Sequence, residues 1–250
     1  MKFLLVNDDG INHINLINTR KALENFGEVY VSAPSEEMSG ASISLKVYRG
    51  IKYHVIDSKN ISVEGTPADC AFVGLYYFGF DTIDIVVSGT NNGFNESYDH
   101  LFSGTIGGAI AGSLFQKKAI ALSADFDDFD MTYEKTKTAI GYILENKLLD
   151  SFPMLSINYP SRGFKEGKGF KAGHINTFPN DEIFVDSNNK IHTYRKSLTK
   201  LPESDRYYSF SGYYSITCIK PSLEDYQLTN KLKKILSVYL RIFLSLFVNW

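Results

Sequence analysis

Short continuous apolar runs alternate, through the first two thirds of the chain, with longer stretches that mix apolar and polar positions. The runs are typical of strands buried on both faces, as in a parallel sheet, and the mixed stretches are typical of helices. The sequence therefore predicts an α/β fold with a mostly parallel sheet. Strands are expected at residues 3–6, 29–33, 83–87, 118–123 and 154–158, and helices at residues 16–26, from 67 onward, at 104–115 and at 133–146.

Local signals place several boundaries. Thr66 is a good N-cap, Pro67 fits the first position of a helix, and Asp69 follows the cap at the spacing of a capping box. Just before this helix, residues 46–63 predict a β-hairpin with its turn near Arg49–Gly50.

The later part of the chain has a different texture, because glycines break up a basic, irregular stretch. Beyond it, the pattern predicts a hairpin around Asn188–Asn189 and a strand over residues 213–219. We therefore expect a core domain in residues 1–160 and a smaller hairpin and helix region in residues 161–250.

Composition restricts the partners and the compartment. The formal net charge of -2 gives no basic face, so a polynucleotide partner is not expected. Two cysteines are too few for a disulfide framework, and the apolar run at residues 3–6 is too short for a secretion signal, so we expect a cytoplasmic protein. The apolar tail at residues 235–248 is shorter than a span of ~20 residues and contains Arg241, which favours a packing helix over a membrane helix.

Polar clusters follow the predicted strands or open the predicted helices, which is where open parallel sheets bind ligands. Asp8 and Asp9 place adjacent carboxylates after the first strand, and a divalent cation such as Mg²⁺ or Mn²⁺ would relieve their repulsion. On this pair alone, an Asp-Gly turn with Asp9 capping the next helix is the favoured interpretation.

The other clusters add ligands without adding charge. The Ser-Gly loop at Ser39 would let the backbone approach an anion or a metal closely, although such loops are common. Asn91 lies between Gly89 and Gly93, and Asn95 follows two residues later; both offer amide groups to a metal or a phosphate, with a long turn as the other interpretation. Residues Ser103–Thr105 open a helix whose free N–H groups suit a phosphate, with a simple N-cap as the alternative.

Taken together, the clusters predict hydrolysis of a phosphate ester at a divalent metal. The sequence has no Gly-x-Ser-x-Gly motif and no cysteine in a basic setting. Its five histidines show no zinc-ligand spacing, so we interpret each of them, His100 included, as a satisfied core or surface side chain.

With these clusters in order, the chain resembles the SurE family of 5′-nucleotidases, also called stationary-phase survival proteins. The strong matches cover roughly the first 125 residues, and no single motif carries them. They are Leu4–Ile11, Ala33–Pro34, Ser39–Ser42, Ser44–Leu45, Gly65–Cys70, Val86–Gly89 with Asn91, Gly93 and Asn95, and Ser103–Thr105, with weaker echoes at 119–123, 157–158 and 212–217.

The resemblance implies a Rossmann-like core with helices on both faces of the sheet, and a C-terminal extension that is exchanged between subunits in a homodimer or tetramer. It implies nucleoside 5′- and 3′-monophosphates as substrates, with short polyphosphate for some members. It also implies one divalent cation per subunit, Mg²⁺ or Mn²⁺. The implied metal ligands are Asp8, Asp9, Ser39 and Asn91, and the implied phosphate contacts are Asn95, Ser103, Gly104 and Thr105.

These assignments lead to a mechanistic hypothesis. The metal polarises a phosphoryl oxygen and activates a water, which Asp8 or Asp9 orients or deprotonates. Asn95, Thr105 and the helix N-terminus stabilise the charge that builds on the phosphoryl group. Direct attack by Asp8, giving an aspartyl-phosphate, is a second route.

The chain also departs from the family pattern, at positions that include none of the implied metal ligands. These are Asn15, Thr90, Ser97, Phe102 and Ala111. The departures keep open a nucleotide-binding or assembly protein of the same fold with weakened catalysis. A phosphoacceptor signalling module is a further alternative, disfavoured because that fold has about half this length.

Overall fold

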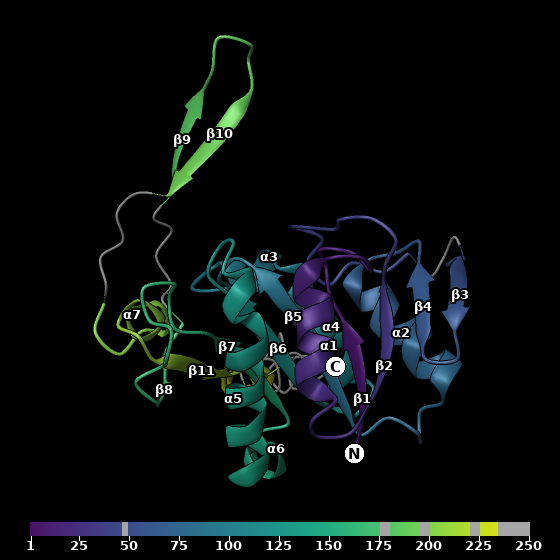
Figure 1. The fold of residues 1–250 in the computed structure, drawn as a ribbon. Helices are drawn as coiled ribbons and strands as arrows, with labels where there is room; N and C mark the ends of the chain where they lie inside the picture. The colour runs from purple at the N-terminus through teal and green to yellow at the C-terminus, as the bar shows by residue number, and fades with distance from the viewer. Residues whose placement is uncertain (47–49, 176–180, 196–200, 221–225, 235–250) are drawn as a thin grey trace, which may run out of the picture. The chain divides into compact units, whose positions relative to one another are not determined.

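The computed structural model describes residues 1–46, 50–175, 181–195, 201–220 and 226–234 (Figure 1). Within these ranges, nine strands form one sheet in the order β3-β4-β2-β1-β5-β6-β7-β11-β8. Pairing is parallel except between β3 and β4 and between β7 and β11, which confirms the mostly parallel sheet. The strands are β1 Lys2–Val6, β2 Glu28–Pro34, β3 Tyr53–Asp57, β4 Asn60–Val63, β5 Ile85–Asn92, β6 Lys118–Ala124, β7 Met154–Asn158, β8 Phe170–Ala172 and β11 Tyr214–Cys218.

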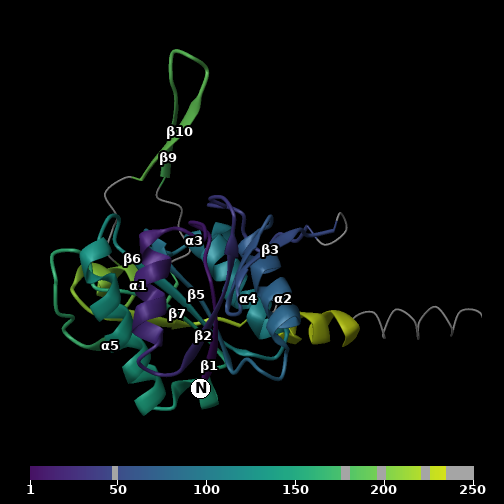
Figure 2. The same ribbon diagram turned by 45° about the vertical axis from the view of Figure 1, so that its right-hand side comes forward.

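Helices cover both faces of the sheet, as expected (Figure 2). Alternate side chains of β1 point to opposite faces: Phe3 and Leu5 share a core with α1 and α5, and Leu4 and Val6 share another with α2 and α4. The helices are α1 Ile14–Leu23, α2 Pro67–Phe78, α3 Asp99–Phe102, α4 Gly104–Leu114, α5 Thr132–Glu145, α6 Leu148–Ser151 and α7 Asp205–Phe210, with a 3₁₀ turn η2 at Phe129–Met131. None of the described helices is long and apolar enough to cross a membrane.

The start of α2 confirms the predicted capping box. Thr66 Oγ1 accepts a hydrogen bond from the Asp69 amide, and Asp69 Oδ2 accepts one from the Thr66 amide. The two bonds satisfy N–H groups that a helix start leaves without helical partners.

The hairpin before α2 is present, but the predicted turn at Arg49–Gly50 is wrong. β3 and β4 pair antiparallel around a turn at residues 58–59, where Asp57 Oδ1 accepts the Lys59 amide at 2.8 Å. An aspartate side chain that bonds the backbone two residues on stabilises such a turn without glycine. Arg49 itself lies outside the described residues.

Strand β5 is longer than predicted, because part of the expected glycine- and asparagine-rich loop continues as strand. Its register with β6 shifts between Ser88 and Asn91, as at a β-bulge. Gly89 permits the close approach, since a Cβ there would lie 2.3 Å from the Leu122 carbonyl oxygen. Pairing with β6 therefore holds Asn91 and Asn92 at the end of a strand.

The later part of the chain contributes to the same sheet through β8 and β11, and residues 1–219 form one compact unit. The predicted hairpin is confirmed as β9 Asp181–Val185 and β10 Ile191–Arg195, a separate two-stranded sheet. In the second unit, residues 220–250, residues 226–234 are helical, and the predicted helix at 235–248 lies outside the described residues. The division near residue 160 and the exchange between subunits stay predictions.

Candidate functional site

The site begins at the carboxyl end of β1, in the tight turn of residues 7–10. The Asn7 side-chain amide donates to the Gly10 carbonyl at 2.9 Å. Gly10 has a φ of +103°, which residues with a side chain rarely adopt, and a bond from the Ile11 amide to the Pro34 carbonyl ties the turn to β2. This turn fixes Asp8 and Asp9 at the edge of the sheet where parallel strands end.

Asp8 is buried against the start of α4. Thr105 donates to it twice, from Oγ1 to Oδ1 at 2.6 Å and from the backbone amide to Oδ2 at 3.2 Å. Gly104 allows this approach, because a Cβ on it would lie 3.0 Å from Asp8 Cβ and 3.1 Å from Pro67 Cγ. The structure thus brings Asp8 together with two of the predicted phosphate contacts, and Thr105 uses both of its donors to position the carboxylate.

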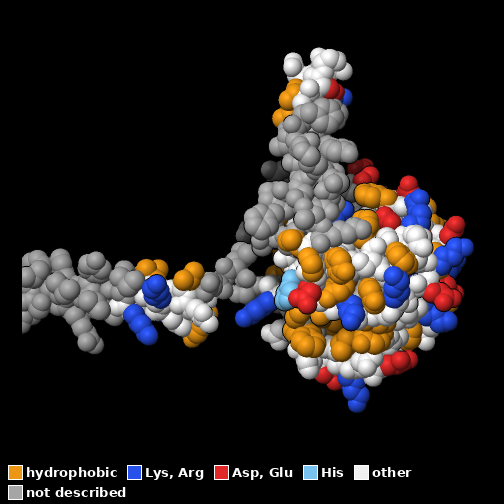
Figure 3. All heavy atoms as spheres, turned by 90° about the vertical axis from the view of Figure 1, so that its left-hand side faces the viewer, with side chains coloured by type: hydrophobic (Ala, Val, Ile, Leu, Met, Phe, Trp, Pro, Cys, Tyr) orange, Lys and Arg blue, Asp and Glu red, His pale blue; other side chains and the backbone are white. Residues whose placement is uncertain are grey.

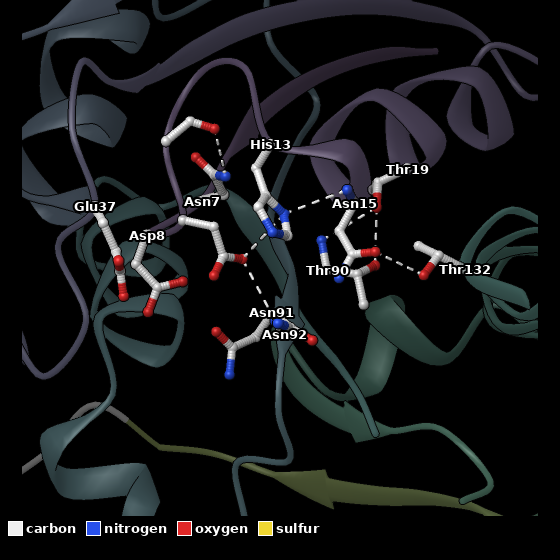
Figure 4. A network of polar contacts seen from close by, with 12 residues as sticks. Asn7, Asp8, His13, Asn15, Thr19, Glu37, Thr90, Asn91, Asn92 and Thr132 are labelled. Atoms are coloured by element: carbon white, nitrogen blue, oxygen red, sulfur yellow. Dashed lines mark hydrogen bonds and ion pairs between the residues drawn. The ribbon is translucent and has the colours of Figure 1, made fainter. Parts of the chain in front are cut away.

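Asp9 contacts His13, just before α1, and Asn92, at the end of β5; Figure 4 shows how these two residues lie. Asp9 Oδ2 lies 3.7 Å from His13 Nδ1 and 3.4 Å from the Asn92 amide nitrogen. His13 in turn caps α1, accepting the Asn15 amide at 3.3 Å. Neither His13 nor Asn92 is among the predicted site residues.

Both carboxyl groups are held in conditions that disfavour their charge. Burial raises the pKa of Asp8 to about 6, and the Asp9 carboxylate adds to the shift, against the hydrogen bonds from Thr105. Burial also raises the pKa of Asp9 to about 6, with a smaller contribution from Glu37. A cation between these groups would oppose both shifts, because opposite charge favours the ionised form.

Of the other two predicted metal ligands, Ser39 lies on a loop beside Asp8, and Asn91 lies near the end of β5. Ser39 is exposed and its hydroxyl donates to Glu37 Oε1 at 2.8 Å, while the adjacent Met38 amide donates to the Asp8 carbonyl at 2.7 Å. Asn91 is partly buried and its amide donates to the Gly93 carbonyl at 2.8 Å. Its side-chain nitrogen is thereby engaged, so its Oδ1 is the atom suited to a metal.

The donor set fits a hard divalent cation. Carboxylate, amide and hydroxyl oxygens are the ligands that Mg²⁺ and Mn²⁺ prefer. The Oδ1 of Asn7 is buried beside them, and no group in the described part of the chain hydrogen-bonds it. Among the described residues, no group of three or more His, Cys, Asp and Glu side chains could hold a metal, so a cation here would depend on two carboxylates and neutral oxygens.

The remaining predicted phosphate contacts, Asn95 and Ser103, lie where β5 leads into α4. The Ser103 hydroxyl accepts the Ile106 amide at 3.1 Å and so caps α4. Asn95 is buried, its side-chain amide donates to Ser123 Oγ at 2.9 Å, and its backbone exchanges two hydrogen bonds with Asn158. These bonds fix both residues at the wall of a cavity.

The cavity has a volume of about 420 Å³ and is lined by four phenylalanines together with polar and charged residues; we call it the aromatic cavity. Asn95 and Ser103 line it, which places it next to the Asp8–Thr105 pair. The other lining residues are Gly40, Phe94, Asp99, Phe102, Asp125, Phe126, Arg206 and Phe210.

Most of this lining was not predicted. Asp125 and Phe126 directly follow β6, so the rule that ligands bind at the ends of parallel strands could have found them. Arg206 lies 110 positions after its partner Glu96, and no short-range pattern connects the two.

Comparison with known proteins gives a consistent result. The sequence model of the family described as survival protein SurE matches residues 3–179. The chain is 33% identical to a 5′-nucleotidase SurE from Clostridium beijerinckii over 94% of its own length and 99% of that protein. It is 36% identical to a 5′/3′-nucleotidase SurE from Wigglesworthia glossinidia brevipalpis over 68% of its length and 69% of that protein. The crystal structure of the Sure protein from Aquifex aeolicus matches with a TM-score of 0.82 at 28% identity, covering 94% of this chain and 99% of that chain.

Proposed function

The chain belongs to the SurE family, and from this premise we propose that it is a metal-dependent phosphatase that hydrolyses nucleoside 5′- and 3′-monophosphates to nucleoside and phosphate. The observation that carries the proposal is the approach of α4 to Asp8. A helix N-terminus, a buried carboxylate pair and a cavity of nucleoside size meet at one edge of the sheet.

The proposed metal ligands are Asp8, Asp9, Ser39 and Asn91, and the cation is Mg²⁺ or Mn²⁺. When bound, it would supply positive charge at the phosphoryl group and acidify a water. Thr105 holds Asp8 in a fixed orientation through both of its donors. Asp9 is the group best placed to accept a proton, because it is less buried than Asp8 and fewer donors engage it.

The phosphoryl group is proposed to bind at Asn95 and Ser103–Thr105. The dipole of α4 favours negative charge there, while both donors of Thr105 stay on Asp8. Asn95 is fixed by Ser123 and Asn158, so its amide needs little reorganisation as charge develops. The nucleoside is proposed to occupy the aromatic cavity beyond.

The test is phosphate release from adenosine and guanosine 5′-monophosphates with Mn²⁺, with Mg²⁺ and with excess EDTA. We expect release only with metal, and a loss on the order of a hundredfold or more in kcat/KM for Asp8→Asn. Asp150→Asn is the matched control, because Asp150 is an exposed carboxylate that pairs with Lys118. Folded wild-type protein that releases no phosphate with either metal would refute the enzyme and favour a binding or assembly role.

We also propose a homodimer or tetramer that forms through residues 161–250. Apolar side chains are exposed in this region, with Val185 and Ile191 60% and 70% exposed on facing positions of the β9–β10 hairpin. Apolar side chains also gather between charged ones on the face of the first unit drawn in Figure 3. Such surfaces are typical of contacts between subunits. A cytoplasmic location remains part of the proposal, and Cys70 and Cys218 are both free thiols.

A further inference from the structure

A buried carboxylate joins helix α7 to the segment that follows β5. Glu96 has no exposed surface. Its Oε2 accepts a hydrogen bond from Arg206 Nη1 at 2.9 Å, and its Oε1 accepts one from the Ser209 hydroxyl. A buried carboxylate with both oxygens engaged holds its partners in one geometry.

A second set of bonds fixes the same two segments beside Glu96. The Ser97 amide donates to Asp205 Oδ2 at 3.0 Å, and His100 Nδ1 lies 3.9 Å from the same oxygen. His100 also bonds the Ser97 carbonyl and the Ser156 hydroxyl, as expected for a satisfied core histidine. Arg206 is therefore attached to a rigid part of the protein.

Arg206 presents its guanidinium to the aromatic cavity. Its Cζ lies 4.5 Å from the centroid of the Phe210 ring, and that ring packs edge-on against Phe94 at 5.4 Å. All three side chains line the cavity next to the proposed phosphate contacts. A guanidinium on an aromatic face makes a flat wall, which suits a planar base.

The charges around Arg206 argue against a second phosphate. Glu96 bonds the guanidinium from one side, and the carboxylates of Asp99 and Asp125 line the same cavity. An anion would lie near these two carboxylates, whereas a neutral nucleoside can accept hydrogen bonds from the guanidinium without that repulsion.

We infer that Arg206 is a specificity-determining residue that binds the nucleoside part of the substrate, and that Glu96 is the positioning residue that holds it. The inference rests on the proposed function only in taking a nucleoside as the ligand. Nucleoside affinity can be measured without turnover.

The experiment measures binding of adenosine and guanosine by calorimetry to the wild-type protein and to Arg206→Met. We expect the variant to bind at least roughly tenfold more weakly, as for the loss of one hydrogen bond to a charged donor. Arg206→Lys keeps the charge but not the planar fork, so it should also bind more weakly, and it replaces Arg206→Met if that variant does not fold. Arg20→Met is the matched control, because Arg20 pairs with Glu24 and Asn60 away from the cavity.

Two further readouts separate recognition from a general structural effect. Arg206→Met should raise KM for the nucleoside monophosphate with a smaller change in kcat. Glu96→Gln should weaken nucleoside binding less than Arg206→Met does, because glutamine can still accept the hydrogen bond.

Each outcome decides one question. Nucleoside binding that is lost in Arg206→Met supports the inference, even if the wild-type protein releases no phosphate and the proposed function fails. The inference is overturned if the wild-type protein binds neither nucleoside at millimolar concentration, or if Arg206→Met binds both as tightly as wild type. It is also overturned if Arg206→Met binds inorganic phosphate more weakly than wild type while it binds the nucleosides equally well, since Arg206 would then be a phosphate ligand.

Discussion

At the scale of single residues, the Thr105–Asp8 contact joins α4 to the carboxylate turn, and its strength can be measured. Thr105→Val keeps the shape of the side chain but removes the 2.6 Å bond to Asp8, leaving a buried carboxylate less satisfied. We expect the free energy of unfolding in urea, measured with EDTA at pH 8, to fall by about 1–3 kcal/mol. Thr105→Ser restores a hydroxyl and should recover most of the loss, whereas equal destabilisation by both substitutions would show that packing, not the bond, is responsible.

Glu96 gives the protein a pH-dependent stability. Burial raises the pKa of Glu96 to about 7, above its usual 4.5. The folded protein then binds the proton more tightly than the unfolded chain, so the contribution is complete below about pH 4.5 and is lost as the pH rises through 7. Between pH 4.5 and 8, we expect the free energy of unfolding of the wild type to fall by on the order of 3 kcal/mol relative to that of Glu96→Gln.

Urea unfolding of both proteins across this pH range checks the difference. Subtracting the variant removes the contributions of Asp8 and Asp9, whose raised pKa values have the same sign. A difference that stays flat with pH would mean that Arg206 and Ser209 keep Glu96 ionised in the folded protein throughout.

How well the sequence predicts the site depends on how far apart in the chain the contacting residues lie. Asp8 and Thr105 both lie at predicted element boundaries, and the strand-end rule alone brings them to one edge of the sheet. The backbone partner of Asp9 is harder to predict from the sequence. The irregularity in β5 decides that the amide of Asn92, and not that of Asn91, faces Asp9. Arg206 enters the cavity only through the packing of α7, which no local pattern encodes.

At the scale of elements, α4 depends on the absence of side chains at its contact face. A Cβ on Gly107 would lie 2.2 Å from the Ser42 carbonyl oxygen, so Gly107→Ala must displace the helix or the loop. We expect a loss of about 1–3 kcal/mol in the free energy of unfolding. Gly141→Ala in α5 is the matched control: the new Cβ would meet only Phe26 at 3.6 Å, and alanine should stabilise the helix by about 0.5–1 kcal/mol.

Opposite signs for the two substitutions in thermal or urea unfolding would confirm close packing of α4. If both substitutions stabilise the protein, the loop at Ser42 can move away from the new side chain without lowering the free energy of unfolding.

The elements that could be predicted are those set by local chemistry. The capping box of Thr66 and Asp69 is complete within four residues, and the buried strands need only a continuous apolar run. The hairpin turn could not be placed, because Arg49–Gly50 is the stronger dipeptide signal while an Asp57 side-chain bond makes the real turn. Strand β8 was missed, since its three residues gain strand structure only by pairing with β11.

At the scale of the whole molecule, the sheet does not stop where the sequence changes texture. β11 pairs antiparallel with β7, and β8 pairs parallel with β11, so residues well beyond 160 extend the core sheet. The alternation of strand and helix patterns in the sequence ends near residue 160. Which strands join the sheet is decided by pairing between residues far apart in the sequence, which that pattern does not show. The β9–β10 hairpin is outside this sheet, and its two strands form a sheet of their own.

The hairpin provides the test of assembly. Val185 and Ile191 face each other across β9 and β10 and are more than half exposed. If they are covered by another subunit, the double variant Val185→Glu and Ile191→Glu should shift the mass in light scattering from two or four chains toward one, because a charge buried at an interface is costly. Lys190→Glu changes charge in the same loop without touching this pair and should leave the mass unchanged. A wild-type mass of one chain at every concentration would contradict the proposed oligomer, and an oligomer that survives the double variant would place its interface away from the hairpin.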